Sequence, residues 1–180
     1  MIYKGNDGNN PKIQLPIQPN IGLDASSRQS VVEILNNTLA NETVLAMKTR
    51  GACWNVCGSS FLELHNFFEG QYKQLNESAG EIAQRTRMLG GFAIASLEEI
   101  LNHSRLQEQP GEMPSVLNLL ADHEAAIRFM REDARKCIEE YEDEGTFEIL
   151  VGVMHMHEKM AWMLRSLVEP GSDSLQNSGR

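Results

Sequence analysis

Apolar residues recur at spacings of three and four through most of this 180-residue chain. That spacing places apolar side chains on one face of an α-helix, whereas a strand would need strict alternation, which the sequence lacks. The pattern therefore predicts an all-α fold with four long helices. We expect them at residues 26–55, 60–88, 115–141 and 145–168, with apolar faces that include Val31, Leu35, Leu39, Leu45, Phe61, Leu64, Phe68, Leu75 and Ile82.

Residues that start and stop helices support these boundaries. The helical pattern of the first helix follows Asp24 and the capping-type residues Ser26 and Ser27, and Ser59–Ser60 could cap the second. Gly90–Gly91 tolerate the positive φ that ends a helix, and Pro170–Gly171 stop the fourth. A short helix fits residues 96–104, inside the long connection between the second and third helices. The order predicts a four-helix bundle with one long crossover.

Length and composition indicate one compact domain in a cytoplasmic protein. With 180 residues, 41% of them hydrophobic, it has enough apolar surface for one compact core. We expect an extended arm at 1–22, the bundle at 23–169 and a solvated tail at 170–180. No run of 18 apolar residues and no secretory signal pattern occur, and three cysteines suit a reducing compartment, so the sequence predicts a cytoplasmic protein.

Two pairs of residues with metal-binding chemistry are spaced four apart. Cys53 and Cys57 flank a tryptophan in the stretch TRGACWNVCG, and His65 and Glu69 share a face of the second predicted helix. Two thiolates and an imidazole form an incomplete zinc set. The alternative is that the cysteines are small buried residues and that His65 and Glu69 are an ordinary surface pair.

Other polar groups have simpler interpretations. His103, His123, His155 and His157 are isolated or face different directions, so we expect them to be structural. A dense acidic group surrounds the junction of the third and fourth helices, where it either caps and solvates the helix end or attracts cations. Its members are Glu139, Glu140, Glu142, Asp143, Glu144 and Glu148.

Several separate stretches, in the same order, resemble the Dps mini-ferritins, the DNA-binding proteins from starved cells. They are LNNTLANETVLAMKTRGACWNVCGSSFLELHNFFEGQYKQL, RTRMLGG, LLADHEAAIRFMRE, DEGT and HEKMAWMLR, and together they span about residues 23–168. The resemblance implies a ferritin-like four-helix bundle with a short helix in the connection between helices two and three. It also implies a shell of twelve subunits that oxidises ferrous iron, stores the ferric mineral and protects against oxidative stress.

The resemblance also implies where iron is oxidised, at a centre shared by two subunits. In the family one subunit supplies a histidine before the tryptophan, then a histidine and a carboxylate, which map here to Cys53, His65 and Glu69. The partner supplies an Asp and a Glu, which map to Gly80 and Gln84. Three of the five positions are therefore replaced, which predicts a degraded ferroxidase centre because iron prefers anionic oxygen ligands. Glu77 lies seven residues before Gln84 and is a possible substitute ligand.

The resemblance also bears on how iron enters the shell, on DNA binding and on two alternative functions. Glu139, Glu144 and Glu148 match the acidic positions of the family's threefold pores. Neither terminal arm is basic, and the net charge is −9 with a pI near 5.0, so we expect weak DNA binding or none. Iron is the expected metal. The alternatives are a non-catalytic shell subunit, which could assemble with an active relative, and a cage that binds zinc at Cys53, His65 and Glu69.

Overall fold

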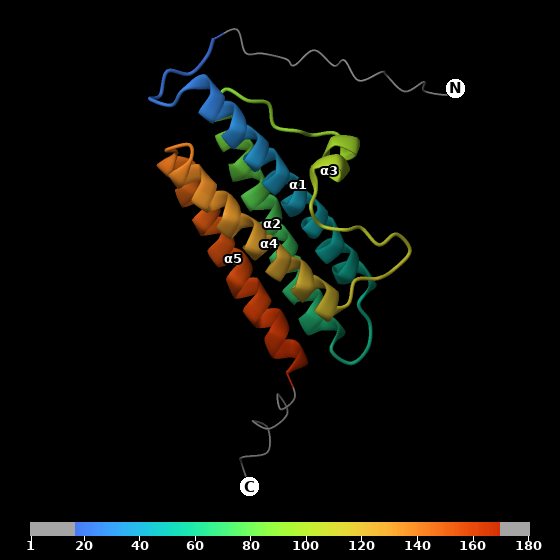
Figure 1. The fold of residues 1–180 in the computed structure, drawn as a ribbon. Coiled ribbons are helices and arrows are strands. Elements are labelled where there is room, and N and C mark those ends of the chain that lie inside the picture. Colours follow the sequence, from blue (N-terminus) through green and yellow to red (C-terminus); the bar gives the residue numbers. More distant parts are fainter. Residues whose placement is uncertain (1–16, 170–180) are drawn as a thin grey trace, which may run out of the picture.

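The computed structural model describes residues 17–169, which form five α-helices and no strand (Figure 1). The all-α prediction is confirmed. Each long helix begins and ends within two residues of its predicted bounds. The predicted tail at 170–180 and most of the predicted N-terminal arm lie outside the described residues. The helices are α1 (Ala25–Asn55), α2 (Phe61–Met88), α3 (Leu97–His103), α4 (Val116–Glu139) and α5 (Glu144–Val168).

Local chemistry explains most of these boundaries. Asp24 caps α1, because its carboxylate accepts hydrogen bonds from the first free backbone amides of the helix. Ser96 and Glu99 form a capping box at the start of α3, and Ser115 caps α4. Ser60 is the N-cap residue of α2 but makes no side-chain capping bond. Gly90 has φ +84° after α2, as the sequence predicted.

The bundle is built from two antiparallel hairpins. The first joins α1 to α2 through a short turn, and the second joins α4 to α5, while the two hairpins contact each other less closely (Figure 1). The crossover carries α3 along the side of α1. Fully buried leucines from all four long helices fill the interior, and the predicted apolar faces of α1 and α2 point into it except at Phe61, which is exposed. The buried leucines include Leu35, Leu45, Leu75, Leu119, Leu150 and Leu164.

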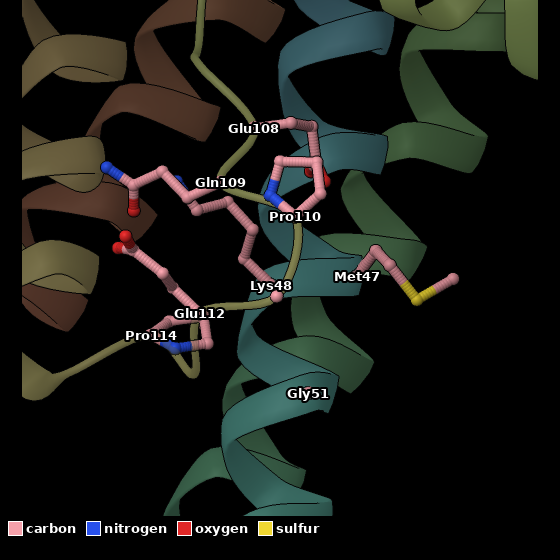
Figure 2. A pocket seen from close by; sticks show the side chains of 9 residues that line it. Met47, Lys48, Gly51, Glu108, Gln109, Pro110, Glu112 and Pro114 are labelled. Carbon is pink, nitrogen blue, oxygen red and sulfur yellow. The ribbon is translucent and has the colours of Figure 1, made fainter.

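The second half of the crossover lies over α1 and forms a surface pocket with it (Figure 2). Met47, Lys48 and Gly51 supply the α1 side, and residues 108–114 supply the other. None of the predicted metal ligands lines this pocket. No helix among residues 17–169 is long and apolar enough to cross a membrane.

Candidate functional site

The predicted ligands of α2 lie along one face of that helix. His65, Glu69, Glu77 and Gln84 follow one another at intervals of one or two turns, and Gly80 lies between the last two. His65 is half-buried at the start of this face, whereas Glu77, Gly80 and Gln84 are exposed. The bundle therefore leaves most of this face exposed.

Cys53 and His65 contact each other where α1 ends and α2 begins. The sulfur atom of Cys53 lies 3.4 Å from Nδ1 of His65, and the same nitrogen lies 3.1 Å from the backbone carbonyl of Cys53. Because a carbonyl only accepts, that contact places a proton on Nδ1 and leaves Nε2 as the nitrogen with a free lone pair. Cys53 thus helps to set the orientation and tautomer of His65.

The thiol of Cys53 is a poor anion in this position. Its side chain is buried, and burial together with the nearby Glu69 carboxylate raises its pKa. Only the thiolate is a good metal ligand or nucleophile. Cys57, by contrast, is exposed, and all three cysteines are free thiols. The sulfur pair proposed from TRGACWNVCG is therefore divided between a buried thiol and an exposed one.

Glu69, the one carboxylate retained at this site, has a competing partner. Lys73 lies one turn further along α2, and its ammonium group is 3.1 Å from the Glu69 carboxylate, with both side chains substantially exposed. The pair cancels much of the negative charge that a cation would meet. Sequence reasoning missed Lys73, although Glu followed by Lys at i,i+4 was a readable signal. Within residues 17–169, no three His, Cys, Asp or Glu side chains are arranged to hold a metal ion.

The acidic group occupies the corner between α4 and α5. Glu139 ends α4, Glu144 begins α5 and Glu148 follows one turn later, and all three are exposed. Asp143 is different, because it is buried and its carboxylate accepts a hydrogen bond from the backbone amide of Thr146. It therefore caps α5 and fixes the direction in which the exposed acids project.

Arg85 of α2 holds this corner in place. Its guanidinium donates to the Asp143 carboxylate at 2.6 Å and to the Thr146 hydroxyl at 2.9 Å. A Cβ at Gly145 would lie 2.9 Å from the same guanidinium, so a larger residue would displace it. The DEGT stretch thus combines a cap, an exposed acid, a space for Arg85 and a hydroxyl acceptor.

The bundle interior contains a polar cluster that the sequence analysis did not predict. Glu42 of α1, His157 of α5 and His123 of α4 are each fully buried. The Glu42 carboxylate lies 2.6 Å from Nε2 of His157, and the two Nδ1 atoms of His157 and His123 are 2.8 Å apart. We call these three residues the Glu–His–His chain. The expectation that His123 and His157 are isolated is wrong, because α4 and α5 bring them together.

The register of the helices contained a sequence signal for the Glu–His–His chain. Glu42 lies three residues before Leu45 and seven after Leu35, in line with the buried stripe of α1. His123 falls between Leu119 and Ala126 in the same way on α4. Each polar residue therefore occupies an interior position of its helix. His155 and His103 do not, since His155 is exposed and His103 bonds the Asn37 side chain at 2.9 Å.

Comparison with known proteins gives the family context of this fold and these residues. The family model for the ferritin-like domain matches residues 32–172. An uncharacterized low temperature-induced protein from Nostoc sp. strain PCC 7120 is 42% identical over 154 residues, which cover 83% of this chain and 86% of that protein. The DNA protection during starvation protein 2 of Bacillus anthracis is 32% identical over 143 residues, covering 78% of this chain and 97% of that protein.

Solved structures agree with these relatives. The Dps protein of Vibrio cholerae O1, described as a member of the ferritin-like diiron-carboxylate superfamily, superposes with a TM-score of 0.78 at 30% identity. That match covers 84% of this chain and 97% of the Vibrio chain. A Dps protein from Bacillus brevis superposes with a TM-score of 0.76 at 29% identity, covering 82% of this chain and all of the other.

Proposed function

Because this chain belongs to the Dps family of ferritin-like proteins, we propose that it forms an iron-storing shell with a degraded ferroxidase centre. The shell is a homo-oligomer of the family's usual twelve subunits, and it protects the cell by sequestering iron. One observation carries the proposal. Of the five ligand positions implied by the family, His65 and Glu69 alone retain a ligand, and Glu69 is already paired with Lys73.

The residues that remain are a weak ligand set for ferrous iron. His65 offers one neutral nitrogen, and Glu69 offers a carboxylate whose charge Lys73 offsets. Gly80 and Gln84, at the positions of the partner's carboxylates, add no negative charge. Glu77 is exposed on the same face and is the substitute we propose, since it restores one anionic oxygen. Ferrous iron favours several such oxygens, so binding and oxidation here are slow.

Iron reaches the interior through the acidic corner in this proposal. Glu139, Glu144 and Glu148 are exposed together, while Arg85 and Asp143 hold the backbone beneath them. A ring of such corners around a threefold axis concentrates cations, because like charges on a low-dielectric wall focus the field. Storage then depends on passage and slow mineralisation rather than on a fast oxidation centre.

A second candidate, a zinc site, rests on the contact between Cys53 and His65. The Cys53 sulfur and Nδ1 of His65 are 3.4 Å apart, and zinc would bind this nitrogen only after the proton that it donates to the Cys53 carbonyl moves to Nε2. Glu69, one turn from His65, would supply a third ligand after its side chain leaves Lys73 and turns toward the other two, since the three side chains do not converge in this structure. Binding must expel the thiol proton of Cys53, whose pKa is raised, so zinc affinity should increase with pH. A shell built around such a site, alone or mixed with an active relative, would be non-catalytic.

Stopped-flow absorbance after mixing ferrous iron with peroxide or oxygen tests the proposal. We expect slow oxidation without a burst that saturates at a fixed iron-to-subunit ratio. The triple variant Cys53→His, Gly80→Asp, Gln84→Glu restores the three replaced ligands and should gain such a burst. Within one subunit the change at residue 80 meets no obstacle, because a Cβ built there has no atom within 4 Å outside the adjacent backbone of its own helix. A saturating burst in the wild-type protein would refute the degraded centre.

Two further measurements test storage and DNA binding. Iron-loaded protein should retain more iron after gel filtration than serum albumin treated in the same way, and equal retention would refute the storage role. The net charge of −9 predicts weak DNA binding or none, so a gel shift should disappear at physiological salt. We also propose a cytoplasmic location, because free thiols suit a reducing compartment.

A further inference from the structure

The Glu–His–His chain is the buried polar group that the proposed iron chemistry does not use. It connects three helices, with Glu42 on α1, His157 on α5 and His123 on α4. Two of its atoms, Oε2 of Glu42 and Nε2 of His123, have no hydrogen-bond partner among the described residues. Its atoms follow one another in line and do not converge on one point, so the arrangement suits protons rather than a metal ion.

The position of the chain matters because α1 and α5 belong to different hairpins. Glu42 and His157 therefore link the α1–α2 hairpin to the α4–α5 hairpin across the core. Two other charged links cross the same boundary, Lys48 to Asp122 at 2.5 Å and Arg85 to Asp143 at 2.6 Å. Those links use lysine, arginine and aspartate, whose ordinary pKa values lie far from neutral. The Glu–His–His chain is the link that contains imidazoles.

The protonation states of His123 and His157 decide whether the hydrogen bond between their Nδ1 atoms can form. One proton must lie between the two Nδ1 atoms, because a hydrogen bond needs one donor and one acceptor. The bond survives when either imidazole is neutral, and the Glu42 carboxylate compensates one positive charge. When both imidazoles are cationic, both Nδ1 atoms carry hydrogens, and the bond becomes a repulsive contact in a dry interior.

Among residues 17–169, each buried carboxylate other than Glu42 is already paired with an arginine, so none of them is free to balance a second cation. On α2, the buried side chains include no titratable group, and the buried polar ones are the amide of Gln71 and the hydroxyls of Ser78 and Thr86. On α4, Asp122 is already paired with Lys48 of α1, and Asp133 is paired with Arg105 of the crossover. Burial, together with the neighbouring His157, holds the pKa of His123 well below its ordinary value.

We propose that the Glu–His–His chain is an acid-sensitive latch that closes the two hairpins onto each other and opens when both imidazoles are protonated. The unfolded chain binds a proton at each histidine near pH 6.5, whereas the folded protein resists the second proton. Stability should therefore be complete above about pH 6.5 and decline as the pH falls below it, since the unfolded state then binds more protons.

Urea denaturation of the full-length protein, followed by circular dichroism at fixed subunit concentration from pH 7.5 to 5.0, tests the latch. The wild-type midpoint should fall across this range. His123→Leu should flatten the dependence by the equivalent of about one proton, following the linkage relation. The matched control is His155→Leu, on α5 two residues from His157 but exposed, and it should keep the wild-type dependence. Equal dependence in the wild type and His123→Leu would overturn the proposal.

Hydrogen exchange of the wild-type protein provides a second test that needs no variant. After correction for the intrinsic pH dependence of exchange, peptides around His123 and His157 should lose protection between pH 7 and 5. Peptides near Arg85 and Asp143, which form one of the two other links, should change less. Uniform protection of all helices across this range would also overturn the latch, whether or not the His123 variant folds.

Discussion

The molecule holds two clusters of histidine and carboxylate groups whose environments are opposite, and one of them also includes a thiol. The α2 face, with Cys53, His65 and Glu69, is partly open, and its carboxylate is paired with a lysine. The Glu–His–His chain of the core is fully buried, and its members bond one another. The open cluster resembles a metal site but lacks ligands, whereas the closed one has ideal contacts but no convergent geometry.

This difference shows that residue type alone does not assign a role. On the open face, a cation competes with Lys73 and with water, so each missing ligand lowers affinity directly. In the core, the same types of side chain have no water to replace a lost partner, so they contribute to stability and its pH dependence. The comparison predicts that substitutions in the core change stability, while those on the face change metal binding.

The largest expected effect is on stability. Glu42→Ala should reduce the free energy of unfolding by about 1.5–3 kcal/mol, because it leaves Nε2 of buried His157 without its hydrogen-bond partner. The matched change on the open face, His65→Ala, should cost less than about 1 kcal/mol, since His65 is only half-buried. Urea denaturation at pH 7.5 measures both. Equal losses for the two variants would remove the distinction between the clusters.

A smaller effect concerns the thiols. Burial raises the pKa of Cys53, and it raises the pKa of Cys137 to about 12, so both remain protonated at pH 8. Cys57 is exposed. A chromogenic disulfide reagent should therefore react with one thiol per subunit rapidly and with the other two only after unfolding. Rapid reaction of Cys53 would show that the open cluster is more accessible than its contacts with His65 indicate.

The smallest expected effect is on the affinity of the open face for zinc. Lys73→Gln releases Glu69 from its ion pair and should raise the affinity for zinc by about 1.5- to 5-fold, the range expected for an exposed pair. Calorimetric titration of zinc into the shell measures the change. The control is Lys136→Gln, which removes a similar i,i+4 pair with Glu132 on α4. An equal gain in the control would assign the effect to net charge alone.

Much of the fold was readable from the sequence because its signals are local. Apolar spacing located the long helices, and Gly90 and the capping residues set their ends through the backbone itself. The acidic corner was also readable, since Glu139, Glu144 and Glu148 lie close together along the chain. The ion pair between Glu69 and Lys73 was also predictable, because Glu and Lys four residues apart on a helix lie on one face.

The Glu–His–His chain could not be predicted as a unit. Glu42 and His157 are 115 residues apart, and His123 and His157 are 34 apart, so their contacts depend on how the hairpins pack. Register placed each residue inside its helix, but it did not say which partner each would meet. The role of Asp143 beneath the acidic corner was hidden in the same way, because Arg85 reaches it from another helix.

Calorimetry during an anaerobic titration of ferrous iron into the shell tests most directly whether the ferroxidase centre is degraded. We expect that iron binding to the wild-type protein has no saturable stage that depends on His65. The triple variant Cys53→His, Gly80→Asp, Gln84→Glu should gain such a stage and should lose it again when His65 is replaced by alanine. A saturable stage in the wild-type shell, at a fixed iron-to-subunit ratio and abolished by His65→Ala, would contradict the degraded centre.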